Sequence, residues 1–197
     1  MKSLSLNVPD EQAQAFAKEL ATLMKKHGVE VENKEAFDSL IPIPERVKTF
    51  EDACKVLGES HPFVTLYQSY MNDLPEHEED DKDVPSYLKL RIIVAALNEG
   101  WKPQFTDGEF RYYPWFVFYT QKELDEMDEE DKQRIRVLGR SNNNANANAG
   151  VGYSSTYCAS SYSNSNHGGR LCFKDRALAE YAGKQFADIW IDFLVTL

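Results

Sequence analysis

Hydrophobic positions recur every three or four residues over five segments of the chain, which is the spacing of one face of a helix. The predicted helices span residues 10–27, 49–58, 61–71, 85–99 and 175–194. A glycine directly follows residues 27 and 99, and another stands at position 58, where glycine readily ends a helix. The segment 85–99 is apolar on nearly all sides, which predicts a buried helix.

Three shorter segments have the composition or the alternation of β-strands. Residues 110–120 are rich in aromatic side chains, and residues 134–138 alternate between polar and apolar. Residues 170–174 are also predicted to form a strand. Pro114 predicts an edge or a bulge in the first strand. Thr120 with Glu123 is a capping box that begins a short acidic helix, and Thr49 with Asp52 resembles one. Residues 29–46 are expected to be irregular, because Pro42 and Pro44 interrupt them.

The order of these elements predicts an α+β protein. It would have N-terminal helices, a C-terminal mixed sheet of short strands with long polar loops, and a closing C-terminal helix. Residues 1–84 would form a helical N-terminal region packed on the core. Residues 85–197 would form the α+β domain.

Residues 141–169 are different from the rest of the chain. They consist only of Ser, Asn, Ala, Gly, Tyr, Val, Thr, Cys and His, although the whole chain is 27% charged. Asn and Ala alternate at the start of the stretch, which in an extended strand would place Asn on one face and Ala on the other. Tyr, Ser, Asn and Gly also dominate antibody binding loops, where Tyr supplies rigid contact area and the others supply adaptable hydrogen bonds.

Two interpretations of this stretch remain open. A polar low-complexity linker is one. An ordered binding surface is the other, because a long structureless segment between two predicted strands is unusual in a compact domain. The candidate ligand-binding residues are Asn142, Asn144, Asn146, Asn148, Tyr153, Ser155, Tyr157, Tyr162, Asn164, Asn166 and His167.

The stretch resembles the C-terminal part of C-type-lectin-like variable proteins of phage and bacterial diversity-generating retroelements. The resemblance lies in the Arg140-Ser141 step, the Asn/Ala run after it, and the segment from Gly168 to Leu171. In that family, adenines of asparagine codons are replaced at random, and the varied residues cover a ligand-binding surface. Such replacement cannot give Lys, Glu, Gln, Met or Trp, and residues 141–169 contain none of these. The resemblance implies a C-type-lectin-like sheet, whereas a helix after it departs from the family.

The net charge and the motifs of the chain limit the partners, the compartment and the activity that we expect. The chain has 22 basic and 32 acidic residues, a net charge of −10 that argues against nucleic acid as the main partner. We expect no membrane span and no export signal, and hence a cytoplasmic or virion-associated protein. Three cysteines suggest reduced thiols. No catalytic motif or metal-ligand spacing stands out, so we expect no enzyme activity, cofactor or metal.

The sequence therefore favours a non-enzymatic protein that displays a tolerant surface to a protein or glycan ligand, as in phage adsorption or host interaction. The alternative is a structural protein of a phage or mobile element, in which residues 141–169 form a subunit contact. A homo-oligomer is compatible with either function.

Overall fold

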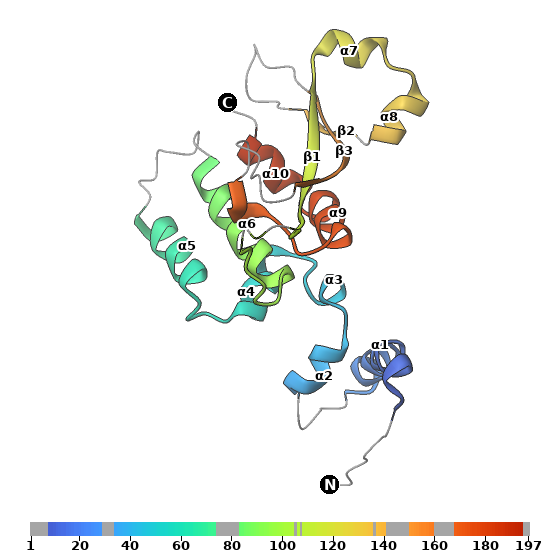
Figure 1. The fold of residues 1–197 in the computed structure, drawn as a ribbon, viewed down its shortest axis with the longest axis vertical. Coiled ribbons are helices and arrows are strands. Elements are labelled where there is room, and N and C mark those ends of the chain that lie inside the picture. The colour runs from blue at the N-terminus through green and yellow to red at the C-terminus, as the bar shows by residue number, and fades with distance from the viewer. Residues whose placement is uncertain are drawn as a thin grey trace. The chain divides into compact units, whose positions relative to one another are not determined.

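The computed structural model describes residues 8–28, 34–73, 83–104, 106, 108–135, 137–140, 150–159 and 168–194 (Figure 1). The chain divides into two compact units, Met1–Arg46 and Val47–Leu197. The sequence-based division, by contrast, falls at residue 84.

The first unit contains three helices among its described residues: α1 (Asp10–His27), α2 (Lys34–Leu40) and α3 (Ile43–Arg46). The prediction of α1 is confirmed, and Gly28 ends it in the left-handed conformation at φ 62°, where its N–H bonds to the Met24 carbonyl. The expectation that residues 29–46 are irregular is wrong, because α2 and α3 lie there. Pro44 is tolerated because it stands in the first turn of α3, where its missing N–H would have no helical partner.

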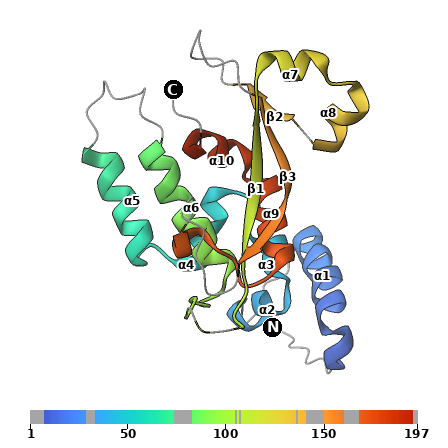
Figure 2. The ribbon, with the colours of Figure 1, turned by 45° about the horizontal axis from the view of Figure 1, so that its top comes forward.

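In the second unit, α4 (Phe50–Leu57) and α5 (Pro62–Asp73) pack on α6 (Asp83–Leu97), as Figures 1 and 2 show. These three helices confirm the predictions for residues 49–58, 61–71 and 85–99. The capping box of α4 is present, since Thr49 Oγ1 accepts from the Asp52 N–H and Asp52 accepts from the Thr49 N–H, both at 3.1 Å. The buried side chains of α6 come from nearly its whole circumference: Leu90, Ile92, Ile93, Val94, Ala96 and Leu97.

The strands β1 (Arg111–Tyr119), β2 (Val137–Arg140) and β3 (Gly150–Ala159) form a sheet in the order β1-β3-β2. Both pairings are antiparallel. Of the two alternatives predicted from Pro114, an edge or a bulge, the edge is confirmed, since β1 lies at an edge of this strand order. The register of β1 against β3 does shift between Trp115 and Phe116, but the extra residue there is Ser154, so the bulge lies in β3.

The described chain is mainly helical, and the predicted fold class, with a C-type-lectin-like mixed sheet, is wrong. Residues 170–174 do not form a strand. They begin in the 3₁₀ helix η1 (Gly168–Leu171) and make one isolated bridge, between Phe173 and Tyr112. Arg134 and Ile135 belong to a helix rather than to β2. A segment of five residues is too short to distinguish a strand from a turn of helix by its pattern, which explains both errors.

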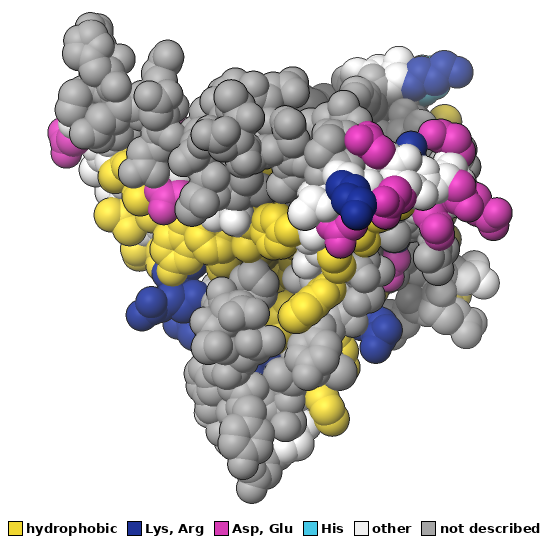
Figure 3. All heavy atoms as spheres, turned by 90° about the horizontal axis from the view of Figure 1, so that it is seen from above, with side chains coloured by type: hydrophobic (Ala, Val, Ile, Leu, Met, Phe, Trp, Pro, Cys, Tyr) yellow, Lys and Arg dark blue, Asp and Glu magenta, His cyan; other side chains and the backbone are white. Residues whose placement is uncertain are grey.

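The acidic segment after β1 folds as two helices, α7 (Gln121–Glu126) and α8 (Glu129–Ile135), where the sequence predicts one. The predicted capping box of α7 is confirmed between Thr120 and Glu123. Asp128 restarts the helix because its carboxylate accepts from the Asp131 N–H at 2.7 Å. Figure 3 shows the acidic side chains of these two helices gathered toward the right of the view.

The predicted C-terminal helix is likewise divided, at Phe186, into α9 (Arg176–Gln185) and α10 (Ala187–Leu194). Asp175 caps α9 by accepting from the Leu178 N–H at 2.8 Å. α9 packs on β1 and β3, and α10 packs on α6 and β2 (Figure 2). The ring of Trp190 lies 5.8 Å from that of Phe116 on β1, measured between centroids. These contacts place the core of the second unit between α6, α9, α10 and the sheet.

Truncation of Trp190 should destabilise the protein strongly, because its side chain is only 1% exposed and no neighbour can fill the space. Trp190→Ala is expected to cost about 3–5 kcal/mol of unfolding free energy. Phe118→Ala is the control, since Phe118 is 47% exposed on β1 and should cost about 1 kcal/mol or less. Urea unfolding followed by circular dichroism measures both. A cost below about 1 kcal/mol at Trp190 would mean that α10 does not hold the core.

Candidate functional site

The middle of the polar stretch 141–169 is the strand β3, and its last two residues begin η1. Gly150, Val151 and Gly152 have pairing partners in both β1 and β2. The remainder of β3, except Ser154, pairs with β1 alone. Weak intrinsic strand formers such as Gly and Ser can hold this conformation because β1, which is rich in aromatic residues, supplies their backbone partners.

The two ends of β3 lie far apart, although both carry candidate binding residues. Gly150 is opposite Tyr119 and Arg140, whereas Ala159 is opposite Arg111. A ten-residue strand is about 30 Å long at roughly 3.3 Å per residue.

Only three of the candidate ligand-binding residues lie within described elements: Tyr153, Ser155 and Tyr157, all on β3. Their partners in the register are Phe116, Trp115 and Tyr113, respectively. The other candidates fall outside the described residues: Asn142, Asn144, Asn146, Asn148, Tyr162, Asn164, Asn166 and His167. The predicted division of Asn and Ala between two faces falls outside them as well.

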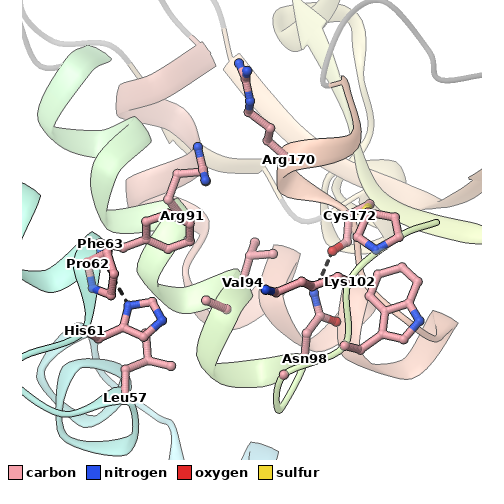
Figure 4. A pocket seen from close by; sticks show the side chains of 14 residues that line it. Leu57, His61, Pro62, Phe63, Arg91, Val94, Asn98, Lys102, Arg170 and Cys172 are labelled. Atoms are coloured by element: carbon pink, nitrogen blue, oxygen red, sulfur yellow. Dashed lines mark hydrogen bonds between the residues drawn. The ribbon is translucent and has the colours of Figure 1, made fainter. Parts of the chain in front are cut away.

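A pocket that the sequence did not predict lies in the second unit, with a volume of about 490 Å³ (Figure 4). Its walls come from the end of α4, the start of α5, the second half of α6, residues 100–103, and the segment of η1 and Cys172. Three lining residues lie on α6, namely Arg91, Val94 and Ala95, and Asn98 follows directly after its end. This volume lies within the range of about 300–1,000 Å³ that is typical of small-molecule sites.

Arg91 is held in place by two contacts at this pocket. Its guanidinium carbon lies 4.2 Å from the centre of the Phe63 ring, a cation–π contact, and Nη1 donates to the Tyr87 hydroxyl at 3.1 Å. His61 fixes the start of α5, because its Nδ1 accepts from the Phe63 N–H at 3.3 Å. The ring of His61 also meets that of Phe63 edge-on. The arginine is therefore oriented before any ligand arrives.

Asn98 attaches the far wall of the pocket to α6. Its Nδ2 donates to the Cys172 carbonyl at 2.8 Å, and its Oδ1 accepts from the Lys174 N–H at 3.0 Å. Between them, Phe173 exchanges two backbone hydrogen bonds with Tyr112 of β1. This short segment is therefore bonded to α6 on one side and to the sheet on the other, and the buried amide has partners at both ends.

One sequence signal points toward the pocket. Arg91 and Asn98 are polar residues seven positions apart, the first on the mostly apolar helix α6 and the second directly after its end. A separation of seven places two side chains on one helical face. The other walls come from residues 57–63, 100–103 and 170–172, and no pattern in the sequence joins these segments.

Among the described residues, no cluster of three or more His, Cys, Asp or Glu side chains could hold a metal ion. No described helix has the length and apolarity that crossing a membrane requires. The chain matches no protein-family model, no curated protein and no solved structure. The function proposed below is therefore inferred from the sequence and the geometry of this chain alone.

The thiol of Cys172, at the pocket wall, is a poor nucleophile at neutral pH. Cys54 and Cys172 are both free thiols. Burial raises the pKa of Cys172 to about 11, and the nearby Arg111 guanidinium opposes that rise only in part. Because thiolate is the reactive form, the folded protein keeps this group protonated and inert. Burial also raises the pKa of Cys54.

Ionisation of Cys172 should make the free energy of unfolding fall as pH rises through the alkaline range. The folded pKa of about 11 lies above the ordinary value of 9.0, so the unfolded chain loses the proton first as pH rises. The stabilisation is complete below about pH 9 and is lost toward pH 11, by at most about 2–3 kcal/mol. Unfolding free energies of the wild type and of Cys172→Ala between pH 8 and 11 measure it. If the free energy of unfolding falls equally with pH in both proteins, Cys172 is not the group responsible.

Proposed function

We propose that the chain is a ligand-binding protein whose recognition surface is built on residues 141–169, with a protein or a glycan as its ligand. The observation that carries this proposal is the position of β3 at the centre of the sheet. A solvated linker has no need of backbone partners, whereas β3 is paired with β1 at every residue except Ser154, and with β2 as well over residues 150–152. This placement supports the binding-surface interpretation over the linker.

The chemistry of the stretch suits recognition. Tyrosine offers a large contact area at low cost in conformational entropy, and Ser, Asn and Gly make hydrogen bonds that adapt to different partners. A strand whose backbone is held by pairing with its neighbours loses less conformational entropy on binding than a free chain does. The contacts of α9 with β1 and β3 give that strand its support.

Variation of this surface is part of the proposal. The resemblance to retroelement variable proteins now rests on the composition of residues 141–169, since the lectin-like sheet of that family is not the fold of this chain. Sequencing this locus in closely related genomes tests variation. Changes concentrated at asparagine codons of the stretch would support it, and changes spread evenly over the gene would contradict it.

Binding should depend on the order of residues beside β3, not only on their composition. Two variants test this, one with residues 141–149 permuted and one with residues 160–167 permuted. Each keeps the composition, so a linker would function unchanged, whereas a recognition surface should lose at least tenfold in affinity through misplaced contacts. Ligands selected by the wild type from a glycan array and from a displayed protein library supply the measurement.

The control is a permutation of residues 76–82, a charged segment outside the proposed surface. Thermal melting of every variant shows that the fold persists. A wild type that selects no ligand, or permuted variants that bind as tightly as the wild type, would contradict the proposal. If a permutation instead dissociates an oligomer of the chain, the subunit-contact function takes its place.

A further inference from the structure

The pocket is basic in a chain that is strongly acidic. The described residues that line it include Arg91, Lys102 and Arg170 but no Asp or Glu, whereas acidic residues outnumber basic ones by 32 to 22 over the whole sequence. Figure 4 shows Arg91 and Arg170 on opposite walls, from α6 and η1. A random sample of this chain's charges would be mainly acidic, so the composition of the lining favours an anionic ligand.

Two carboxylates close in sequence to the pocket, those of Glu99 and Glu109, have partners of their own. Glu99 pairs with Lys174 at 2.9 Å. Glu109 accepts two hydrogen bonds from the Gln104 N–H, at 3.2 and 2.9 Å. Among the described residues, Lys102 and Arg170 make no ion pair with a carboxylate. Their charges are therefore not neutralised by a described acid.

Apart from His61 and Asn98, the other described lining residues are mainly apolar or aromatic. They include Leu57, Pro62, Phe63, Val94 and Trp101. Aromatic and aliphatic walls with a few convergent polar groups are typical of sites that bury an organic molecule. The flat rings of Phe63 and Trp101 suit a planar body, which prefers offset or edge-on contact with aromatic side chains.

We propose that this pocket binds a small organic anion in which a carboxylate or phosphate group is attached to a planar apolar body. Arg91, Lys102 and Arg170 hold the anionic group, and the apolar walls hold the body. The stacking of Arg91 on Phe63 orients the guanidinium, which lowers the entropy lost on binding. The site does not depend on the recognition surface proposed for residues 141–169, because none of its described lining residues belongs to that stretch.

Two fluorescent probes of nearly identical shape test the proposal. The first is 8-anilinonaphthalene-1-sulfonate, an organic anion with a planar aromatic body, and the second is N-phenyl-1-naphthylamine, which lacks the sulfonate. Lys102→Gln and Arg170→Gln each remove one exposed charge, and each should weaken binding of the anionic probe about three- to tenfold. Affinity for the neutral probe should not change. Added salt should likewise weaken only the anionic probe.

Two further variants complete the test. Lys122→Gln removes an exposed lysine from α7, outside the pocket, and should leave both affinities unchanged. Ala95→Trp fills the pocket and should abolish binding of both probes, with thermal melting as the check on folding. If the charge variants weaken both probes alike or neither, or if the filled pocket still binds them, the proposal is overturned.

Displacement of the anionic probe identifies the anionic group. Benzoate and phenyl phosphate carry the same ring with a carboxylate or a phosphate, and the better competitor indicates which group the pocket prefers. Inorganic phosphate, which has no ring, should compete far more weakly than phenyl phosphate. Failure of both ring compounds to displace the probe, or equal competition by inorganic phosphate, would also overturn the proposal.

Discussion

The second unit depends on the burial of α6 on nearly all of its sides. Leu90, Ile92, Ile93, Ala96 and Leu97 are completely inaccessible to solvent. Each large aliphatic side chain contributes about 1.5–3 kcal/mol when fully buried. That burial requires partners on every face, and α4, α5, α9, α10 and η1 supply them. The helix is therefore the element against which the others are positioned.

Asn98 extends this constraint from α6 to the sheet. It follows the last turn of the helix and bonds the backbone at Cys172 and Lys174, while Phe173 between them bonds to Tyr112 of β1. Loss of this amide would leave a buried carbonyl without its partner, at a cost of about 1–3 kcal/mol. The same residue lines the pocket, so the scaffold and the proposed anion site share one polar anchor.

Much of the helical framework follows from local pattern, whereas the pocket does not. Residues 10–27 and 85–99 have long periodic patterns with clear ends, and α1 and α6 lie there. The capping boxes at Thr49 and Thr120 are also local, because the interacting groups stand three residues apart. The prediction of a strand at residues 170–174 is wrong because the hydrogen bonds that fix this segment, to Asn98 and Tyr112, involve distant parts of the chain. The lining of the pocket extends along the chain from Leu57 to Cys172, and its segments are distant from one another in sequence. The spacing of Arg91 and Asn98 is the one local pattern that points to it.

Hydrogen exchange across residues 141–169 tests the central claim, that the polar stretch is built into the sheet, most directly. The amides of Val151 and Gly152 lie between two paired strands and should exchange most slowly. Residues 153–159 pair on one edge only, so protection should be confined to roughly alternate amides there. This pattern, measured by NMR at neutral pH, is the predicted result. Uniformly fast exchange from Gly150 to Ala159 would contradict the account and restore the linker interpretation.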